Sequence, residues 1–452
     1  MQPIDVNAYT YHTRKLELGI SLLEAFERLH ARFAAVFLLE SLEKNERVSR
    51  YSIVGFDPRH RISARNWQLT IDGETHASAD PYAELRALMG TARLPHVGFV
   101  GGLVGYFSYE ATRYFEPGLS FHETEFPDFE FGLYLDGLIY NKVTDEVYYF
   151  YLDEDRGAMV LDAIEKPPTE ETLHVQYLGS NIEREEHAEM FRRAKEEILA
   201  GNSYQVQYSR KFNYRLCGSR LGIYRQLRIV NPSPHMFYLK FDDREVIGSS
   251  PEIVVRMERG LVEIIPIAGT TRRGKTAEED RALGEAMLHD EKEVAEHMML
   301  VDLARNDVGR LCSFHTVQVR RLMYILRFSH VQHIVTDVEG QIAPDKDMFD
   351  VYAVASPAGT VTGAPKIESM RIISELEREG RGPYAGSVGY FSLSGDCYFA
   401  IAIRSLFCNG EHGWSQAASG IVYDSDAEYE YQEVEQKGAS MRRAIQLAEV
   451  AG

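Results

Sequence analysis

Hydrophobic and polar residues follow two periods along the second half of this chain. Short apolar or alternating runs predict strands, namely "SYQVQYSRKF", "HMFYLKF", "REVIGSS", "SHVQHIVTDVEG" and "CYFAIAIRSLF". Helical patterns separate these runs, but they lack the regular strand–helix–strand order that builds a parallel sheet. The pattern therefore predicts a mixed α/β (α+β) fold layered as a sandwich, and it argues against a Rossmann sheet.

A polar segment with two prolines predicts a boundary between two regions. In "AIEKPPTEETLHVQYLGSN" the adjacent Pro167 and Pro168 follow an aromatic, strand-like run. We therefore expect an N-terminal region of residues 1–165 and a C-terminal region of residues 180–447. The latter opens with "EREEHAEMFRRAKEEILAGNSY", a predicted surface helix capped by Gly201, whose apolar stripe would contain Ala188, Phe191, Ala194 and Ile198.

Composition and charge narrow the possible functions. The 452 residues carry a formal net charge of -19 at pH 7, which excludes a broad nucleic-acid surface because such surfaces need clustered Lys and Arg. An anionic ligand would need a local cation or arginine to overcome long-range repulsion. The four scattered cysteines fit a reducing compartment, and the longest apolar run, "FAAVFLL", is too short to span a bilayer. We expect a cytoplasmic protein without nucleic-acid or membrane partners.

Two predicted helices each carry a pair of carboxylates three residues apart. Glu293 and Glu296 lie in "DEKEVAEHMMLVDLARNDVG", and Glu430 and Glu433 lie in "EYEYQEVEQKGASMRRAI". This spacing puts both carboxylates of a pair on one face of the helix. If the two helices meet, the pairs would form an oxygen-only site for a hard cation such as Mg²⁺. The alternative is two solvated helix faces, with Glu433 paired to Lys437.

Single polar residues in apolar surroundings are further candidates. His330 and His333 lie three apart in a predicted strand, so they face opposite sides and cannot chelate one ion together; one of them could be an acid or base, or both could be structural. Glu252 follows Pro251 at a predicted turn. Arg404 interrupts the apolar strand "AIAIRSLF" and predicts a carboxylate partner, either from the protein or from a ligand.

Taken together, the motifs resemble those of the chorismate-utilising enzymes, and among these the large subunit of anthranilate synthase. The matching segments, in order, are "LLES", "SRYSIVG", "NPSPHMF", "GSSPE", "PIAGT", "EVAEHMMLVDLARND", "SPAGTVTGAPK", "RGPYAGSVGY", "FAIAIRS" and "YEYQEVEQKG". The resemblance implies a layered sandwich with antiparallel sheets inside and helices outside. It also implies Mg²⁺-dependent conversion of chorismate and ammonia to anthranilate and pyruvate, the first step of tryptophan biosynthesis.

The resemblance implies roles for the residues that match. Mg²⁺ would be surrounded by Glu293, Glu296, Glu430 and Glu433. Glu252 would protonate the departing ring hydroxyl, His333 would be the base for the elimination of pyruvate, and Thr270 would offer a hydroxyl beside the ring. Contacts to the substrate would come from Arg404 and Tyr384 at the enolpyruvyl carboxylate, and otherwise from Ala268, Gly269, Thr360, Gly420 and Lys437.

The early motifs imply regulation as well. "LLES" and "NPSPHMF" match a tryptophan feedback site that would contain Glu40, Ser41 and Met236; ordinary buried strand and turn residues are the alternative. Two residues depart from the family pattern. His235 stands where a tyrosine is usual, within the inhibitor region, and Ala418 replaces a glycine near Gly420.

Three other functions compete with anthranilate synthesis. Isochorismate and salicylate synthases use a lysine base where this chain has Gln205, and a neutral amide cannot be that base. Aminodeoxychorismate synthase typically has a nucleophilic lysine at the position of Ala268, so a methyl group there favours direct addition of ammonia. A silent, ligand-binding relative would be expected to lose acid, base or metal positions, and all of them are present. The sequence has no recognisable glutaminase, so ammonia would come from solution or from a separate glutamine amidotransferase subunit.

Overall fold

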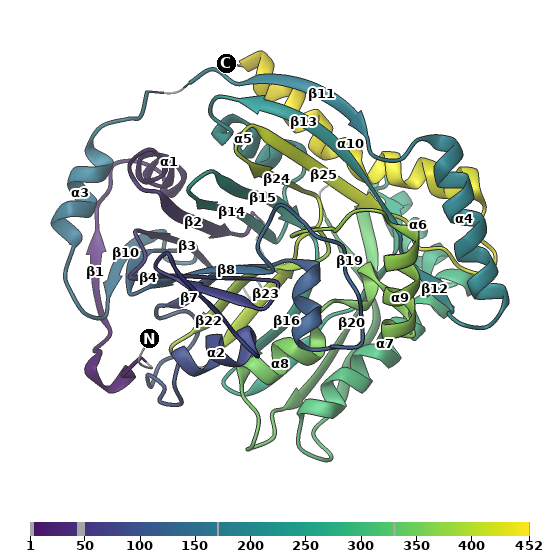
Figure 1. Cartoon of the computed structure of the whole chain (residues 1–452), viewed down its shortest axis with the longest axis horizontal. Helices are drawn as coiled ribbons and strands as arrows, with labels where there is room; N and C mark the ends of the chain where they lie inside the picture. The colour runs from purple at the N-terminus through teal and green to yellow at the C-terminus, as the bar shows by residue number, and fades with distance from the viewer. Residues whose placement is uncertain (1–3, 43–49, 170, 329–330, 452) are drawn as a thin grey trace.

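The computed structural model describes residues 4–42, 50–169, 171–328 and 331–451. Two large antiparallel sheets pack face to face with helices on their outer faces (Figure 1). His330 lies outside the described residues. The sandwich predicted from the strand pattern is thus confirmed, including its antiparallel sheets.

The first sheet has eleven strands. Their order is β1 (His12–Leu16), β10 (Glu146–Tyr151), β9 (Asp136–Asn141), β3 (Tyr51–Phe56), β2 (Ala35–Glu40), β14 (His235–Phe241), β15 (Arg244–Ser250), β24 (Ser405–Asn409), β25 (His412–Ala418), β13 (Ser209–Cys217) and β11 (His174–Ser180). Alternation explains why this sheet is covered on both sides. Along β14, Phe237, Leu239 and Phe241 belong to the core shared with the second sheet, whereas Met236 and Tyr238 belong to the core under the helices.

The second sheet has twelve strands. Its main path is β18 (Ile267–Arg272), β20 (Val331–Gln341), β17 (Leu261–Ile264), β16 (Ile253–Glu258), β23 (Cys397–Ile401), β22 (Ser387–Ser392), β7 (Gly102–Phe107), β8 (Phe129–Tyr134), β4 (His60–Arg65), β5 (Gln68–Ile71) and β6 (Glu74–Ala77), and β19 (Gln318–Arg327) pairs with β20. A separate two-stranded sheet joins β12 (Gln205–Val206) to β21 (Gly363–Ala364). Both large sheets contain strands from each predicted region, and the division into 1–165 and 180–447 stays a prediction.

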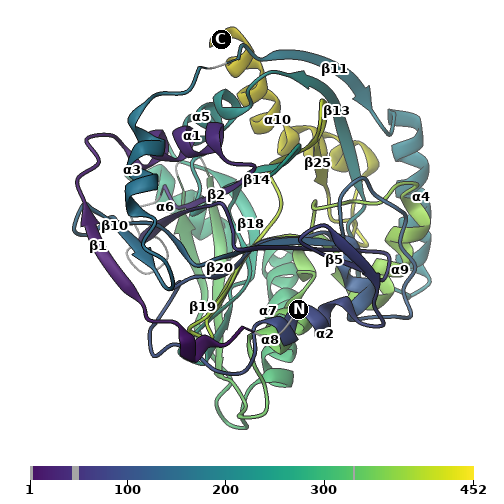
Figure 2. The same cartoon turned by 60° about the vertical axis from the view of Figure 1, so that its left-hand side comes forward.

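Helices cover the two outer faces. The first sheet is covered by α1 (Leu22–Arg32), α3 (Gly157–Glu165), α5 (Leu221–Val230) and α10 (Ala427–Ala451). On the side of the second sheet lie α2 (Pro81–Leu88), α6 (Ala277–Leu288), α7 (Glu291–Leu311) and α8 (Met348–Ala355). Figure 2 shows α2, α7 and α8 side by side in a second view. The other helical elements are α4 (Arg184–Leu199), α9 (Lys366–Leu376) and the 3-10 turns η1 (Val6–Ala8), η2 (Tyr109–Tyr114) and η3 (Gly359–Val361).

The helix predicted to open the second region is α4, and its buried stripe differs from the prediction. Ala194 and Ile198 are buried as expected, and Gly201 follows the helix with a φ of +81°. Ala188 is exposed, however, and His187 and Met190 are buried instead. The reason is that the ring of His187 packs between Tyr208 and Tyr431, which rotates the buried face by part of a turn.

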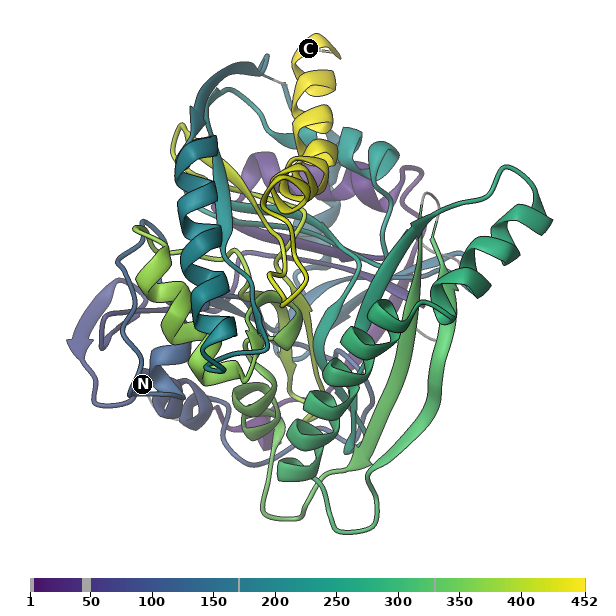
Figure 3. The same cartoon turned by 90° about the vertical axis from the view of Figure 1, so that its right-hand side faces the viewer.

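The longest helix on the second sheet, α7, runs beside the long strands β19 and β20 (Figure 3). Asp290 caps its N-terminus by accepting hydrogen bonds from the backbone N–H groups of Lys292 and Glu293. Val301, Ala304 and Val308 then pack on Val338 of β20. This packing leaves Glu293 and Glu296, one turn after the cap, on the face that borders β18 and β20. Among the described residues, none of the helices has both the length and the apolar content that a membrane span needs.

Candidate active site

Two predicted site residues lie where the chain crosses from one sheet to the other. Glu252 stands between β15 of the first sheet and β16 of the second, and Arg404 stands between β23 and β24 on the return crossing. The crossings are joined, because the N–H of Ile401 donates to the carbonyl of Glu252 over 3.0 Å and the N–H of Ser249 donates to the carbonyl of Arg404 over 3.3 Å. The fold thus brings an acid and a guanidinium to one corner of the sandwich.

The local sequence explains the first crossing. Pro251 has no N–H for the sheet ladder, so β15 ends at Ser250. The Ser250 hydroxyl donates to the carbonyl of Glu252 over 3.0 Å and accepts from its N–H over 3.3 Å, which closes a tight turn. The Glu252 side chain, only 8% exposed, is directed into the protein and accepts a hydrogen bond from Thr360 Oγ1 over 2.9 Å.

Burial determines the protonation state of Glu252. Desolvation raises the pKa of its carboxyl to about 8, and the hydrogen bond from Thr360 opposes this shift only in part. Because no cation is paired with it among the described residues, the carboxyl stays protonated at neutral pH. A protonated carboxyl can donate a proton to a leaving group, which is what a general acid requires.

Arg404 occupies a different position from the one predicted. The prediction placed it inside an apolar strand, but β23 ends at Ile401 and β24 begins at Ser405. Arg404 has a φ of +53°, in the left-handed region that the sharp change of sheet requires. Its guanidinium donates to the carbonyl of Lys437 over 3.1 Å and has no carboxylate within ion-pair distance among the described residues. The described residues therefore do not supply the carboxylate partner that was predicted for Arg404, which leaves a ligand as the other predicted source.

His333 on β20 faces the stretch "PIAGT" on β18. The two strands pair with one extra residue, Gly269, between Ala268 and Thr270. Gly269 has a φ of +65°, a conformation typical of a glycine bulge, and its carbonyl accepts a hydrogen bond from His333 Nδ1 over 2.8 Å. Thr270 Oγ1 lies 3.0 Å from the same nitrogen.

These contacts assign the proton of the imidazole. Because a carbonyl can only accept, His333 carries its proton on Nδ1 and Nε2 keeps a free lone pair. Burial lowers the pKa of His333, and the charge of Arg404 lowers it further. The hydrogen bond to the carbonyl of Gly269 acts in the opposite direction and raises it. A neutral imidazole with a free nitrogen has the form that a general base needs.

The four predicted metal ligands come from α7 and α10. Glu293, Glu296 and Glu433 are half-buried, and Glu430 is only 2% exposed, so a solvated helix face does not describe Glu430. Burial raises the pKa of Glu293 and of Glu296, and the charge of Glu433 contributes to both shifts. The two helices therefore bring their carboxylates within electrostatic reach of one another.

The carboxylates do not yet form a close group. Among the described residues, no set of three or more His, Cys, Asp or Glu side chains is arranged to hold a metal ion. Lys437 Nζ lies 2.8 Å from Glu433 Oε1 and also donates to the carbonyl of Ala418 over 3.0 Å. Glu430 Oε2 is buried without a hydrogen-bond partner. Four carboxylates from two helices, one of them with an orphaned oxygen, are by their chemistry a donor set that suits Mg²⁺.

The remaining predicted contacts surround these groups. Tyr384 is buried, and burial raises the pKa of its phenol. Thr360 lies on η3, and Gly420 lies beside Gln205, whose amide nitrogen would be 2.7 Å from a Cβ placed on Gly420. This close approach explains the glycine. Burial lowers the pKa of Arg404, whereas the charges of Tyr384 and Glu433 raise it. These three predicted residues therefore interact electrostatically.

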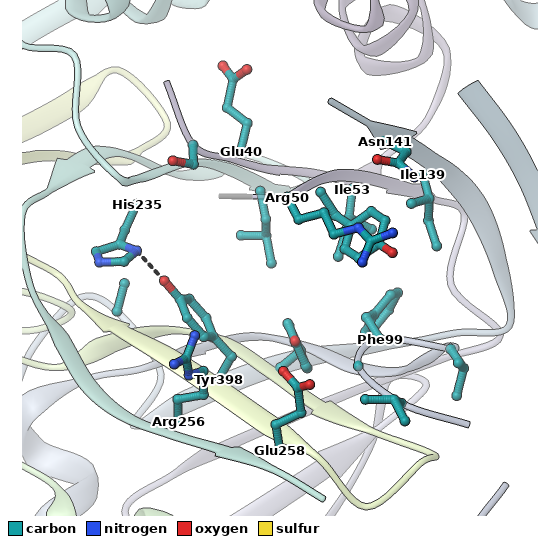
Figure 4. A pocket seen from close by; sticks show the side chains of 18 of the residues that line it. Glu40, Arg50, Ile53, Phe99, Ile139, Asn141, His235, Arg256, Glu258 and Tyr398 are labelled. Atoms are coloured by element: carbon teal, nitrogen blue, oxygen red, sulfur yellow. Dashed lines mark hydrogen bonds between the residues drawn. The ribbon is translucent and has the colours of Figure 1, made fainter. Parts of the chain in front are cut away.

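A cavity lies between the two sheets. It has a volume of about 650 Å³ and is lined by strands of both sheets, including Leu39, Ser41, His235, Met236 and Tyr398. Figure 4 shows the Tyr398 hydroxyl bonded to Nδ1 of His235 across this space. The carboxylate of Glu40 points away from the cavity, where Arg228 Nε and the Tyr224 hydroxyl each donate to it over 2.8 Å.

Comparisons with known proteins agree with this geometry. The family model described as "chorismate binding enzyme" matches residues 34–443. The chain belongs to the chorismate-binding enzyme family. It is 44% identical over 444 residues to anthranilate synthase component 1 of Leptospira biflexa, covering 97% of this chain and 96% of the relative. The relative of the same name from Methanothermobacter thermautotrophicus is 43% identical, and the match covers 94% of this chain and 92% of the relative.

A solved structure extends the agreement to the fold. Anthranilate synthase component I from Streptococcus pneumoniae superposes with a TM-score of 0.78 at 33% identity, covering 88% of this chain and 93% of that chain. Within the chorismate-binding enzymes, the chain therefore belongs to the anthranilate synthase component 1 family. The resemblance drawn from the motifs and the layered fold that it implied are both confirmed.

The sequence reasoning missed several charged residues around the site. Lys366 Nζ donates to Asp307 Oδ2 over 3.0 Å, which ties α9 to α7. Arg381 and Glu377 form a buried ion pair beside η3 and β12. The available signal was a charged residue among small or apolar ones, as in "TGAPKIESM" and "RGPYAGSVGY", because such a charge is costly to bury without a partner.

Proposed function

We propose that this chain converts chorismate and ammonia to anthranilate, pyruvate and water, with Glu252 as the general acid and His333 as the base. The observation that carries the proposal is the corner where the sheets cross. There the two joined crossings carry a carboxyl kept protonated by burial and a guanidinium that has no carboxylate partner among the described residues. An acid to protonate a leaving hydroxyl and a cation to hold an anion are what this reaction requires.

The first stage replaces the ring hydroxyl of chorismate. Ammonia adds to the ring carbon beside the ring carboxylate, the double bonds shift, and the hydroxyl leaves as water with the proton from Glu252. Arg404 and Tyr384 hold the enolpyruvyl carboxylate, and the wall formed by Ala268 and Gly269 lies beside the ring. Ala268 has no group that could attack the ring, so ammonia itself is the nucleophile.

The second stage forms the aromatic product. His333 removes the ring proton at the carbon that carries the amine, the electrons move into the ring, and the enolpyruvyl group leaves to give pyruvate. The free lone pair on Nε2 and the carbonyl of Gly269 behind Nδ1 suit this role, since the carbonyl stabilises the imidazolium that results. Thr270, beside the same imidazole, helps to orient it.

The residues present fit a bound Mg²⁺, which Glu293, Glu296, Glu430 and Glu433 would hold. When bound, the ion supplies positive charge to the ring carboxylate of the substrate. This charge offsets the repulsion between an acidic protein and a dianion. Lys437 would then release Glu433 and be free for the substrate.

We infer further that ammonia comes from a separate glutamine amidotransferase subunit. The matched relatives are named component 1, which implies a second component for those proteins. We also infer a cytoplasmic enzyme, because the four cysteines are free.

For the inter-sheet cavity we propose tryptophan as a feedback ligand. The cavity offers aromatic and apolar walls with the polar groups of Ser41 and His235. Calorimetry with millimolar tryptophan tests this. Absence of heat at that concentration would remove the feedback proposal and leave the catalytic one unaffected.

The catalytic proposal is tested with the purified chain, chorismate, Mg²⁺ and an ammonium salt. We expect anthranilate fluorescence to rise together with one pyruvate per anthranilate. Glutamine in place of the ammonium salt should give no product until an amidotransferase subunit is added. Consumption of chorismate without pyruvate would contradict the proposal.

A further inference from the structure

The most completely buried charged side chain near the active site is that of Arg381, which is 1% exposed. Arg381 lies in the segment that leads from α9 to Tyr384. Its guanidinium makes four hydrogen bonds. Nε donates to Glu377 Oε2 over 2.8 Å, and one terminal nitrogen donates to Glu377 Oε1 over 2.7 Å and to the carbonyl of Gln207 over 2.6 Å. The other terminal nitrogen donates to the carbonyl of Val361 over 2.9 Å.

These bonds connect two loops that approach the substrate from different parts of the chain. Val361 belongs to η3 and directly follows Thr360, whose hydroxyl donates to Glu252. Gln207 follows β12, which pairs with β21 and packs on α9. The N–H of Gln207 also donates to the carbonyl of Thr362 over 3.0 Å. Arg381 thus lies at the point where the two loops meet.

Glu377 holds the guanidinium from the other side. It caps the C-terminus of α9 and is 8% exposed. Besides Arg381, its Oε1 accepts from the N–H of Ser209 over 2.8 Å and from the Ser209 hydroxyl over 2.7 Å. The flat face of Arg381 lies 4.5 Å from the ring centroid of Tyr109. The orientation of the fork is therefore fixed by an ion pair and by an aromatic face.

From this geometry we propose that Arg381 is a positioning residue, which holds Thr360 in place to bond Glu252. The proposal rests on the proposed function, because it assigns Arg381 to the acid step of that reaction. A buried ion pair is weak evidence for stability, since desolvation offsets much of its attraction. Arg381 makes four directional bonds, two to the Glu377 carboxylate and two to loop carbonyls. Such bonds are better explained as fixing the position of the loops. Lysine could not replace these bonds, because an ammonium lacks the planar fork.

The proposal predicts a change in the pH dependence of turnover. The hydrogen bond from Thr360 is the interaction that lowers the pKa of Glu252 against the effect of burial. If Thr360 moves away, the pKa of Glu252 rises further, and the acid stays protonated to higher pH. A misplaced η3 should also reduce turnover, because small errors in position near the reacting groups are costly.

The experiment compares Arg381→Lys with the parent enzyme, from pH 6 to 10, at a fixed concentration of free ammonia. We expect kcat to fall about 10- to 100-fold at pH 7. We expect the alkaline limb of the kcat profile to move upward by roughly half to one pH unit. Thr360→Val should move the limb by the same amount, and the double variant should move it no further.

Arg220→Lys is the matched control. Arg220 pairs with buried Glu245 at 3.1 Å, and its other hydrogen bonds go to the carbonyls of Leu216 and Gly410. This variant should keep the parent limb even if its melting temperature falls. Should Arg381→Lys fail to fold, Glu377→Gln keeps the shape of the anchor, weakens its hold on the guanidinium and should give a smaller shift in the same direction.

Two results would overturn the inference. One is an Arg381→Lys variant, or Glu377→Gln in its place, that loses turnover equally at every pH. The other is a double variant whose limb moves further than that of Thr360→Val alone. A parent enzyme that makes no anthranilate would contradict the proposed function instead, so the two failures are distinguishable.

Discussion

The crossing corner and the inter-sheet cavity share strands β16 and β23 but differ in the partners of their polar groups. In the cavity, Arg256 pairs with Glu263 and the Tyr398 hydroxyl is bonded to His235, while Arg228 and Tyr224 bind the carboxylate of Glu40 outside it. Among the described residues, Glu252 at the corner is bonded only by the hydroxyl of Thr360, Arg404 has only a carbonyl, and Glu430 on α10 keeps one oxygen without a partner.

The difference supports the proposal that the cavity binds a ligand and that the corner is the site of chemistry. Side chains that already have partners can line a ligand cavity, because a ligand that binds there changes their protonation little. Unpaired buried groups are costly, and their pKa values are perturbed, as they are at many active sites. A substrate and a metal ion bound at the corner would offset this cost.

The largest effect should follow from removing a metal ligand at the corner. We expect Glu296→Ala and Glu433→Ala each to reduce turnover at least about 1000-fold, because several kcal/mol of charge stabilisation would be lost. Circular dichroism should show a folded protein in both cases. Glu428→Ala, an exposed carboxylate of α10 that pairs with Arg184, is the control and should keep the parent rate. Full activity in excess chelator would contradict the metal assignment.

The next largest effect concerns the acid. We expect Glu252→Gln to lower kcat about 100- to 10000-fold, because an amide cannot donate the proton. In the parent enzyme, turnover should fall as pH rises through about 8, where Glu252 ionises.

The stability of the same variant gives an independent check on this pKa. A carboxyl whose pKa is raised on folding favours the folded state below its unfolded pKa, and this contribution is lost as pH rises through the folded value. The parent enzyme should therefore lose stability relative to Glu252→Gln between pH 5 and 9, as urea unfolding would measure. Parallel curves would show that Glu252 is not perturbed.

A smaller effect is expected at the base, and on one stage only. His333→Met should slow the loss of pyruvate about 100-fold while ammonia addition changes little, so that an amino-substituted intermediate accumulates. Quenched samples analysed by liquid chromatography would reveal it. If the variant makes anthranilate at the parent rate, His333 is structural and another group is the base.

The smallest effect on catalysis should come from the cavity. Tyr398→Phe removes the hydroxyl that is hydrogen-bonded to His235. We expect a loss of about 1 kcal/mol in the free energy of unfolding, typical of one hydrogen bond, with turnover within about twofold of the parent. A large loss of turnover would mean that the cavity and the corner are not separate in the way described.

The sequence predicted the strands and helices near the site well. "HMFYLKF" and "REVIGSS" coincide with β14 and β15, because alternating apolar residues between turn residues leave little choice of register. The paired carboxylates do lie on helices, as their spacing required. The motifs together predicted the family, because ten matching segments in a fixed order are far more specific than a single matching segment.

Other features depend on packing that no local pattern reveals. Arg404 was assigned to a strand because the apolar run continues through it, although the run spans a change of sheet. Thr270 and His333 meet only through the pairing of β18 with β20, and the bulge at Gly269 sets which of their atoms meet. Arg381 satisfies carbonyls of two distant loops, a role visible only in three dimensions.

The most direct test of the central claim follows the nitrogen. The enzyme is incubated with chorismate, Mg²⁺ and ¹⁵N-labelled ammonium, and the products are identified by mass spectrometry. The account predicts one ¹⁵N atom in ortho-aminobenzoate, an equal amount of pyruvate, and no covalent adduct on the protein. Label recovered in 4-amino-4-deoxychorismate, with no pyruvate released, would contradict it and would identify an aminodeoxychorismate synthase.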